Sequence, residues 1–177
     1  MLTHTRANSP AALRAVRANT EALGFRDRVF YAVTCRHAFH HYREPQRAMN
    51  EMARVACDGG SVVIADTISP DDDGVARAMH DVEIGRDPSH VRNQTQRGFE
   101  ELFAAAGLVV TEAVHAWSEQ KFDAWCQRTD TPIHASEGLW TKLNETRATH
   151  TAFRVRTDGS VRRFAWPVLV IAGKKPE

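Results

Sequence analysis

The sequence predicts an α/β fold of the three-layer sandwich type, and two observations support this prediction. An apolar segment at 29–34 and a second one at 61–65 flank a helical pattern, as expected for parallel strands joined by a crossover helix. The chain then ends in two strand-like segments around Asp158-Gly159, a pair typical of a hairpin turn. Alternating strands and helices followed by a terminal antiparallel hairpin indicate three layers.

The composition is that of an ordinary globular protein. The 177 residues are 42% hydrophobic and 25% charged, which suits a single domain over 1–177. A formal net charge of +1 offers no positive excess for nucleic acid or an anionic membrane. No apolar run approaches the roughly 18 residues that span a bilayer, and no signal peptide is recognisable. We therefore expect a cytoplasmic protein with no nucleic-acid and no membrane partner; three widely spaced cysteines suit reduced thiols.

The first half of the chain contains the clearest elements. Residues 11–18 alternate loosely and predict a short strand. Residues 29–34 are β-branched and aromatic without alternation, which is typical of a strand covered on both faces. Pro45 opens a helix at a first-turn position, and apolar residues then recur at helical spacing. The second buried strand, 61–65, follows Gly59-Gly60.

The second half adds helices and the terminal hairpin. A helix over 74–85 begins beside a run of carboxylates, which the helix dipole favours there, and Thr95 caps the next helix. A third strand is expected over 108–117. The segment of about 118–150 is mostly helical and is expected to form a lid insertion. The hairpin pairs 152–156 with 161–173.

Polar residues follow the two central strands, where ligands collect in open α/β sheets. The first group is Cys35 to His41 and the second is Asp66-Thr67. His40 or His41 is a candidate general base, because imidazole titrates near neutral pH. The alternative is a histidine that only fixes the loop through the backbone. Asp66 is a candidate catalytic residue or, alternatively, a capping carboxylate of the loop.

A metal site is the other possibility raised by three histidines within five residues. His37 and His41 would share one face if their segment were helical. A third ligand is needed, and the sequence does not identify one among Asp66, His80 and His90. We therefore predict no metal. His90 lies in the loop R-D-P-S-H, which is a candidate substrate contact or a turn with capping residues.

Three segments in this order resemble a known family: T-C-R-H-A-F-H-H-Y, R-V-A-C-D-G-G-S-V-V-I-A-D-T-I-S-P and R-D-P-S-H-V-R. They look like class I S-adenosylmethionine-dependent methyltransferases, nearest to the C-methyltransferases of ubiquinone and menaquinone biosynthesis. The resemblance implies a Rossmann-like sheet of seven strands with the last antiparallel, S-adenosylmethionine as cofactor and a small-molecule substrate. It also implies cofactor contacts from Asn19, Glu21, Arg36 and His37.

The departures from the family are equally specific. The family opens with a strand and a Gly-rich loop, and its second strand ends in an acidic residue that holds the ribose. None of the ten glycines here forms a G-x-G, and Asn19 stands where the family has an aspartate. The expected fold is therefore Rossmann-like but N-terminally truncated, lacking the first two strands. Their absence would leave strand 29–34 as an apolar edge, which we expect a homodimer or a partner chain to cover.

Three functions remain open from the sequence. The first is a small-molecule methyltransferase, or a truncated homologue of one, with His40 or His41 as base. The second is a methyltransferase-like protein that has lost cofactor binding and acts as a dimeric binding or scaffold protein. The third is a cofactor-independent acid–base enzyme that uses His40, His41 and Asp66. Fold analogy alone does not choose among them.

Overall fold

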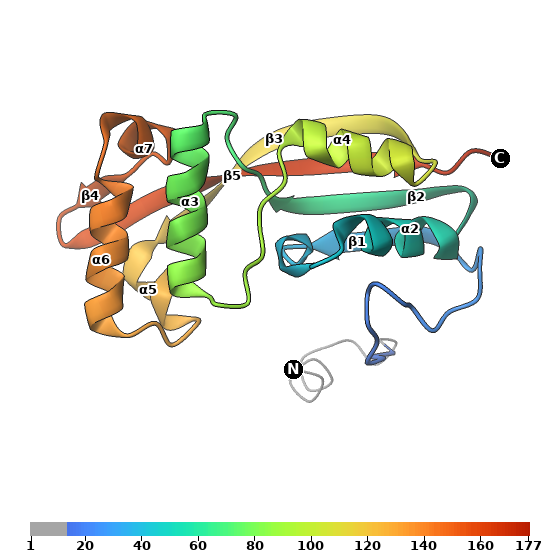
Figure 1. The fold of residues 1–177 in the computed structure, drawn as a ribbon, viewed down its shortest axis with the longest axis horizontal. Coiled ribbons are helices and arrows are strands. Elements are labelled where there is room, and N and C mark those ends of the chain that lie inside the picture. The colour runs from blue at the N-terminus through green and yellow to red at the C-terminus, as the bar shows by residue number, and fades with distance from the viewer. Residues whose placement is uncertain (1–13) are drawn as a thin grey trace.

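The computed structural model describes residues 14–177, which form a five-stranded sheet with helices packed at its two ends (Figure 1). The elements in chain order are β1 (Phe30–Arg36), the 3-10 helix η1 (Phe39–His41), α2 (Pro45–Val55), β2 (Ala56–Thr67), α3 (Asp73–Arg86), α4 (Gln96–Ala105), β3 (Val109–Lys121), α5 (Phe122–Gln127), α6 (Ile133–Leu143), α7 (Arg147–Ala152), β4 (Arg156–Asp158) and β5 (Val161–Lys174).

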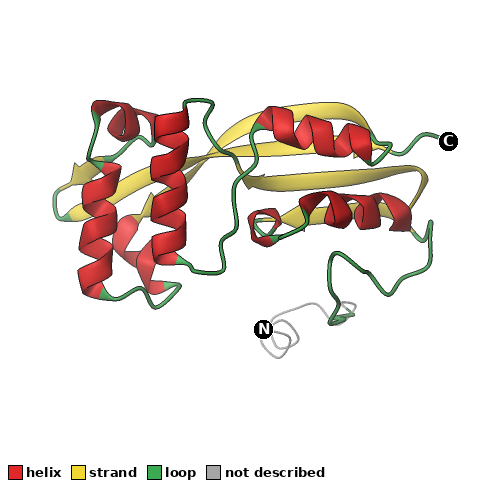
Figure 2. Cartoon of the chain, viewed as in Figure 1, coloured by secondary structure: helices red, strands yellow, loops and turns green. Residues whose placement is uncertain are grey.

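The sheet has the strand order β1-β2-β5-β3, and the short β4 pairs with the start of β5 (Figure 2). Strands β1 and β2 are parallel and joined through α2, whereas β5 runs antiparallel to both β2 and β3. This arrangement confirms the α/β prediction, with its parallel crossover unit and antiparallel final strand. Among the described residues, no helix is long and apolar enough to cross a membrane.

The first apolar core lies between the sheet and the helices α2 and α4. Ile64 of β2 pairs with Ile171 of β5, and both are fully buried beneath the helices. Met49 of α2 and Phe103 of α4 belong to the same core and contribute its helical side. Gly173 permits the close packing, because a Cβ there would lie 2.5 Å from the Phe103 ring.

The second core lies at the other end of β5, where α3, α5, α6 and α7 gather (Figure 1). Side chains alternate along a strand, so Phe164 and Trp166 point to the side of β5 opposite to Ile171. Their rings pack edge-to-face with centroids 4.8 Å apart, and Trp125 of α5 adds a third ring 4.9 Å from Phe164. The aromatic residues of this segment therefore act mainly as core, and they position the helices beside the carboxyl end of the sheet.

The bounds of the last strands differ from those predicted. Strand β3 continues four residues beyond 117 because Ser118 to Lys121 pair with β5. The segment expected as a helical lid contains α5, α6 and α7. The strand placed at 152–156 is wrong in its bounds, because α7 continues to Ala152 from a capping box built on Thr146 and Thr149.

The open edge of the sheet is β1, which pairs only with β2 in the described part of the chain. The strand expected over 11–18 is not confirmed: 11–13 lie outside the described residues, and 14–18 form no strand. The expectation that β1 is covered on both faces is wrong, since Tyr31 is 86% exposed and Thr34 is exposed as well. No neighbouring strand or helix covers that side among residues 14–177.

Candidate active site

Asp66 organises the carboxyl ends of β1 and β2. Its side chain is buried, and its carboxylate accepts hydrogen bonds from the backbone N–H groups of Ala38 (3.2 Å), Phe39 (2.7 Å) and Thr67 (2.7 Å). Burial by itself raises the pKa of this carboxyl, but the hydrogen bonds, above all that of His40, outweigh burial and lower the pKa below its ordinary value. Asp66 is therefore an ionised anchor that folds the loop after β1 onto β2.

His40 forms the most direct side-chain contact of Asp66. Its Nδ1 donates to Asp66 Oδ1 at 2.6 Å, and the side chain is 16% exposed. Burial lowers the pKa of His40, but the hydrogen bond and negative charge of Asp66 outweigh it, so the net pKa lies above the ordinary value. The donation from Nδ1 leaves Nε2 as the free nitrogen, which is the arrangement of a carboxylate-oriented base.

His37 and His41 flank this pair in different ways. His37 adopts a left-handed backbone (φ 47°) at the end of β1, and its Nδ1 lies 4.0 Å from Asp66 Oδ1, too far for a hydrogen bond. Burial lowers the pKa of His37. His41 donates from Nδ1 to the carbonyl of Ser89 at 3.0 Å. His41 therefore ties the loop to the residues after α3, whereas His40 carries the Asp66 contact.

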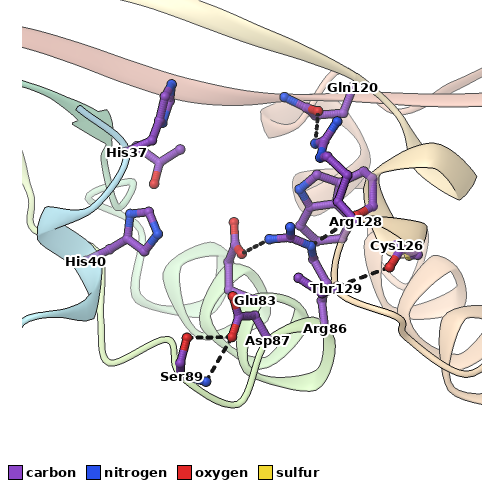
Figure 3. A network of polar contacts seen from close by, with 12 residues as sticks. His37, His40, Glu83, Arg86, Asp87, Ser89, Gln120, Cys126, Arg128 and Thr129 are labelled. Carbon is purple, nitrogen blue, oxygen red and sulfur yellow. Dashed lines mark hydrogen bonds and ion pairs between the residues drawn. The ribbon is translucent and has the colours of Figure 1, made fainter. Parts of the chain in front are cut away.

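A cavity of about 240 Å³ opens beside these histidines and is bounded on the far side by α3, α5 and β3 (Figure 3). Residues at its lining are His37, His40, His41, Thr67, Glu83, Arg86, Asp87, Ser118, Gln120, Trp125, Arg128 and Trp166. The loop R-D-P-S-H, a candidate substrate contact in the sequence, supplies Arg86 and Asp87 to the lining. Glu83, one helical turn before Arg86, had no comparable signal in the sequence. Gln120 and Arg128 reach the cavity through tertiary packing alone.

Glu83 is the buried carboxyl of this cavity, only 6% exposed. Its nearest cation is Arg86, whose Nη1 lies 3.6 Å from Glu83 Oε2, beyond hydrogen-bond distance. Burial raises the pKa of Glu83 to about 7, although Arg86 and His40 oppose the shift. Asp87, at the rim, is held by Ser89, which donates to it from the backbone N–H at 2.9 Å and from the hydroxyl at 2.6 Å.

His90, the candidate substrate contact, lies behind the histidine pair and not in the cavity lining. Its ring is 5% exposed and sits 5.4 Å from the His40 ring. Neither nitrogen has a hydrogen-bond partner among the described residues. Burial, followed by the neighbouring histidines His40, His80 and His41, lowers the pKa of His90 to about 4. His90 therefore packs as a neutral ring against the active-site loop.

The four residues implied as cofactor contacts do not gather at one place. His37 lines the cavity, and Arg36 is exposed at the end of β1. Glu21 accepts from the backbone N–H of Glu44 at 3.1 Å, next to the start of α2, and Asn19 Oδ1 accepts from the N–H of Glu21. Neither Asn19 nor Glu21 lines the cavity. Within residues 14–177, no group of three or more His, Cys, Asp or Glu residues has the arrangement of a metal site.

Comparison with known proteins decides the family. Residues 1–64 match the family model described as "Methyltransferase domain". The uncharacterized methyltransferase YcgJ of Bacillus subtilis is 31% identical over 125 residues, which are 70% of this chain and 49% of YcgJ. The chain belongs to the class I methyltransferase family. It spans about half the length of that curated relative.

Solved methyltransferase structures superpose on the fold. The crystal structure of YcgJ matches with a TM-score of 0.89 at 26% identity, over 99% of this chain and 76% of YcgJ. The protein BH2331 of Bacillus halodurans matches with a TM-score of 0.87 at 24% identity, over 93% of this chain and 78% of its own. Geranyl diphosphate methyltransferase, solved in complex with SAM, shares the fold with a TM-score of 0.54 at 13% identity, over 89% of this chain and 56% of its own. These methyltransferase structures therefore confirm the fold expected from the sequence.

Proposed function

We propose that this methyltransferase-family chain takes part in S-adenosylmethionine-dependent methyl transfer to a small molecule in the cytoplasm. The observation that carries the proposal is the Asp66–His40 pair, hydrogen-bonded at 2.6 Å at the carboxyl ends of two parallel strands and facing the cavity. This is where ligands bind in open α/β sheets. The comparison with a relative solved in complex with SAM supports the choice of cofactor.

The described residues do not form a complete site for that cofactor. Its ribose and amino-acid ends are usually held by an acidic residue and a Gly-rich backbone, and this chain has no G-x-G. The two buried carboxylates near the cavity are engaged otherwise, Asp66 by His40 and the loop, Glu83 beside Arg86. We therefore assign the acceptor side of the reaction to residues 14–177. Arg36 and His37 are the proposed cofactor contacts in this part.

The acceptor side requires a group that removes a proton as the acceptor is methylated. His40 Nδ1 stays bonded to Asp66, so Nε2 is the nitrogen that takes up the acceptor's proton. The negative charge of Asp66 stabilises the imidazolium that results. His41, fixed to Ser89, keeps the loop closed against α3. Positioning of the acceptor against this base accounts for the chain's contribution to catalysis.

The Asp66–His40 pair leads to a prediction that can be tested without a substrate. In the folded protein, NMR titration should place the pKa of His40 above the ordinary 6.5, because Asp66 favours the charged imidazole. Replacement of Asp66 by Asn removes that charge and should lower the pKa of His40. The variant Asp58→Asn, on an exposed part of the same strand, is the control and should leave it unchanged. A His40 that titrates at or below 6.5 in the native chain would show that Asp66 does not raise its pKa, and it would contradict the assigned Asp66–His40 pair.

Titration calorimetry with S-adenosylhomocysteine tests the function itself. Because the chain has no Gly-rich loop, we expect binding weaker than the micromolar range, weakened further by His37→Ala and unchanged by His134→Ala, since His134 lies outside the cavity lining. The absence of heat from a protein with native circular dichroism would overturn the methyltransferase proposal for this chain. It would leave cofactor-independent acid–base chemistry at His40, or a scaffold role, as the surviving functions.

The open edge of β1 supports a separate proposal, that a second copy of the chain covers it. The N–H of His37 donates to the carbonyl of Ala65 on β2. Along a strand, successive N–H groups point alternately to one neighbour and to the other, so the N–H of Thr34, three residues earlier, points to the open side. Exposed Tyr31 and Val29 would be covered by such pairing.

Substitution of Thr34 by Pro removes one amide donor from that edge and leaves the β2 ladder intact. Light scattering across a concentration series should show a dimer for the native chain. The Thr34→Pro variant should associate at least roughly tenfold more weakly, because a loss of about 1.4 kcal/mol raises the dissociation constant tenfold. Thr34→Val keeps the amide and is the matched control. A native chain that stays monomeric at tens of micromolar would exclude the homodimer and favour a different partner chain.

A further inference from the structure

The cavity beside His40 has two chemically different walls (Figure 3). The wall formed by the loop after β1 carries the histidines and the proposed base. The opposite wall carries Arg86, whose guanidinium lies over the Trp125 ring, together with Arg128 and Trp166. The proposed reaction uses only the first wall. The second wall has not been assigned a role.

Arg86 is held rigidly at that wall. Its Nε donates to the carbonyl of Trp125 at 3.2 Å, and its guanidinium lies 4.4 Å above the Trp125 ring centroid. The side chain is only 15% exposed, and the nearest carboxylate, Glu83, is 3.6 Å away and so not hydrogen-bonded. A guanidinium has five N–H donors, and the contacts of Arg86 leave donors on its outer nitrogens available to a ligand.

Arg128 is a second donor at the same cavity. Arg128 donates from Nη2 to Gln120 at 2.7 Å, which orients it across the mouth and leaves its other N–H groups available. Trp166 lines the cavity at 2% exposure, and its indole N–H has no hydrogen-bond partner among the described residues.

Two acidic groups share the cavity with these donors. Asp87, at the rim, accepts two hydrogen bonds from Ser89, both on Oδ1. Glu83 lies deeper, and its raised pKa of about 7 means that much of it is uncharged at neutral pH. Trp125 and Trp166 add the apolar part of the lining, which favours an apolar body between the donors and His40.

We propose that the substrate of this site is a small carboxylic acid with an apolar body, whose carboxylate binds Arg86 and Arg128 and whose reacting group points to His40. Two N–H groups of a guanidinium match a carboxylate in geometry, which makes such contacts both strong and specific. The assignment of the reacting group rests on the proposed function. The assignment of the carboxylate contact does not, because it concerns binding alone.

Three matched probes test the ligand class by calorimetry and tryptophan fluorescence at constant ionic strength: benzoate, the neutral benzamide and the cationic benzylamine. We expect benzoate to bind at least roughly tenfold more tightly than either of the others, as for a ligand carboxylate paired with arginine. Equal binding of benzoate and benzamide, or tighter binding of benzylamine, would overturn the proposal. The latter result would mean that Glu83 and Asp87 set the preference.

Single substitutions then locate the contact. Arg128→Gln and Arg86→Gln should each weaken benzoate binding by about tenfold or more and leave benzamide binding nearly unchanged. Arg97→Gln, on an exposed part of α4, is the control and should bind benzoate like the native chain. Arg86 also contacts Trp125, so the result for Arg86→Gln counts only if the variant has native circular dichroism. Arg128 lies at the exposed mouth of the cavity, and its variant therefore tests the contact independently. Undiminished benzoate binding in Arg128→Gln would overturn the assignment. None of these measurements requires S-adenosylmethionine, so they stay informative if the methyltransferase test fails.

Discussion

Replacement of Asp66 by Ala is expected to lower the free energy of unfolding by about 3–5 kcal/mol, the cost of breaking a buried charged pair. The carboxylate is buried and accepts the N–H groups of Phe39 and Thr67 at 2.7 Å, together with His40 Nδ1 at 2.6 Å. Its loss leaves these donors unpaired in a place that water reaches poorly. The measurement is urea unfolding followed by circular dichroism.

The control for this prediction comes from the same strand. Asp58 also carries ion pairs, with Arg28 at 3.3 Å and Lys175 at 3.8 Å, but it is 40% exposed. Exposed pairs contribute at most about 1 kcal/mol, so Asp58→Ala should change the unfolding free energy by less than that. Equal changes in the free energy of unfolding for Asp66→Ala and Asp58→Ala, with an unchanged dependence on urea, would contradict the prediction. Asp66 would then contribute no more than an exposed carboxylate and would not anchor the loop.

Replacement of Glu83 by Gln should stabilise the protein at high pH and have little effect at low pH. The pKa of Glu83 rises from 4.5 to about 7 on folding, because burial disfavours its charged form. The folded state therefore binds the proton more tightly than the unfolded chain. The stability due to the neutral carboxyl is complete below pH 4.5 and is lost as the pH rises through 7. Above pH 8, Gln at this position should be more stable by about 3 kcal/mol, since one pKa unit corresponds to 1.36 kcal/mol.

The measurement is the difference in unfolding free energy between the native chain and Glu83→Gln from pH 4.5 to 8.5. The charged and titratable groups that act on Glu83 are Arg86, His40, Asp87 and Asp66, and they are present in both proteins. His90 destabilises the fold as the pH falls, because its pKa is lowered to about 4, but it cancels in the difference. A difference that stays constant with pH would show that Glu83 is solvated. A less stable Gln variant at pH 8 would show that the Glu83–Arg86 attraction outweighs burial.

The local pattern of the sequence was enough to place the central βαβ unit. The apolar segments before Cys35 and Asp66, and the helix between them, form β1, β2 and α2, although β2 already begins at Ala56 and includes Gly59-Gly60. The helical spacing of apolar residues in α2 and the continuous apolar runs of the two strands are properties of neighbouring residues, so they are readable from the sequence. The three family-like segments likewise indicated the methyltransferase family, which the comparisons show. The polar residues at the two strand ends do meet, because parallel strands end on the same edge of a sheet.

The sequence left His40 and His41 equivalent, and it placed His90 among the substrate contacts. Only the tertiary structure distinguishes them: Asp66 contacts His40, Ser89 holds His41, and His90 packs behind the pair. These differences depend on how η1 turns over the end of β2, which no spacing along the chain encodes.

The sequence by itself therefore determined the α/β class, the parallel unit and the family, because each depends on short-range pattern. Tertiary structure alone decided which histidine meets Asp66 and brought Glu83, Arg86 and Arg128 to the same cavity. It also showed that residues 14–18 form no strand and that β1 is the edge of the described sheet. The reason is physical: contacts between segments far apart in the chain depend on packing of whole elements, and their residues carry no shared local signal.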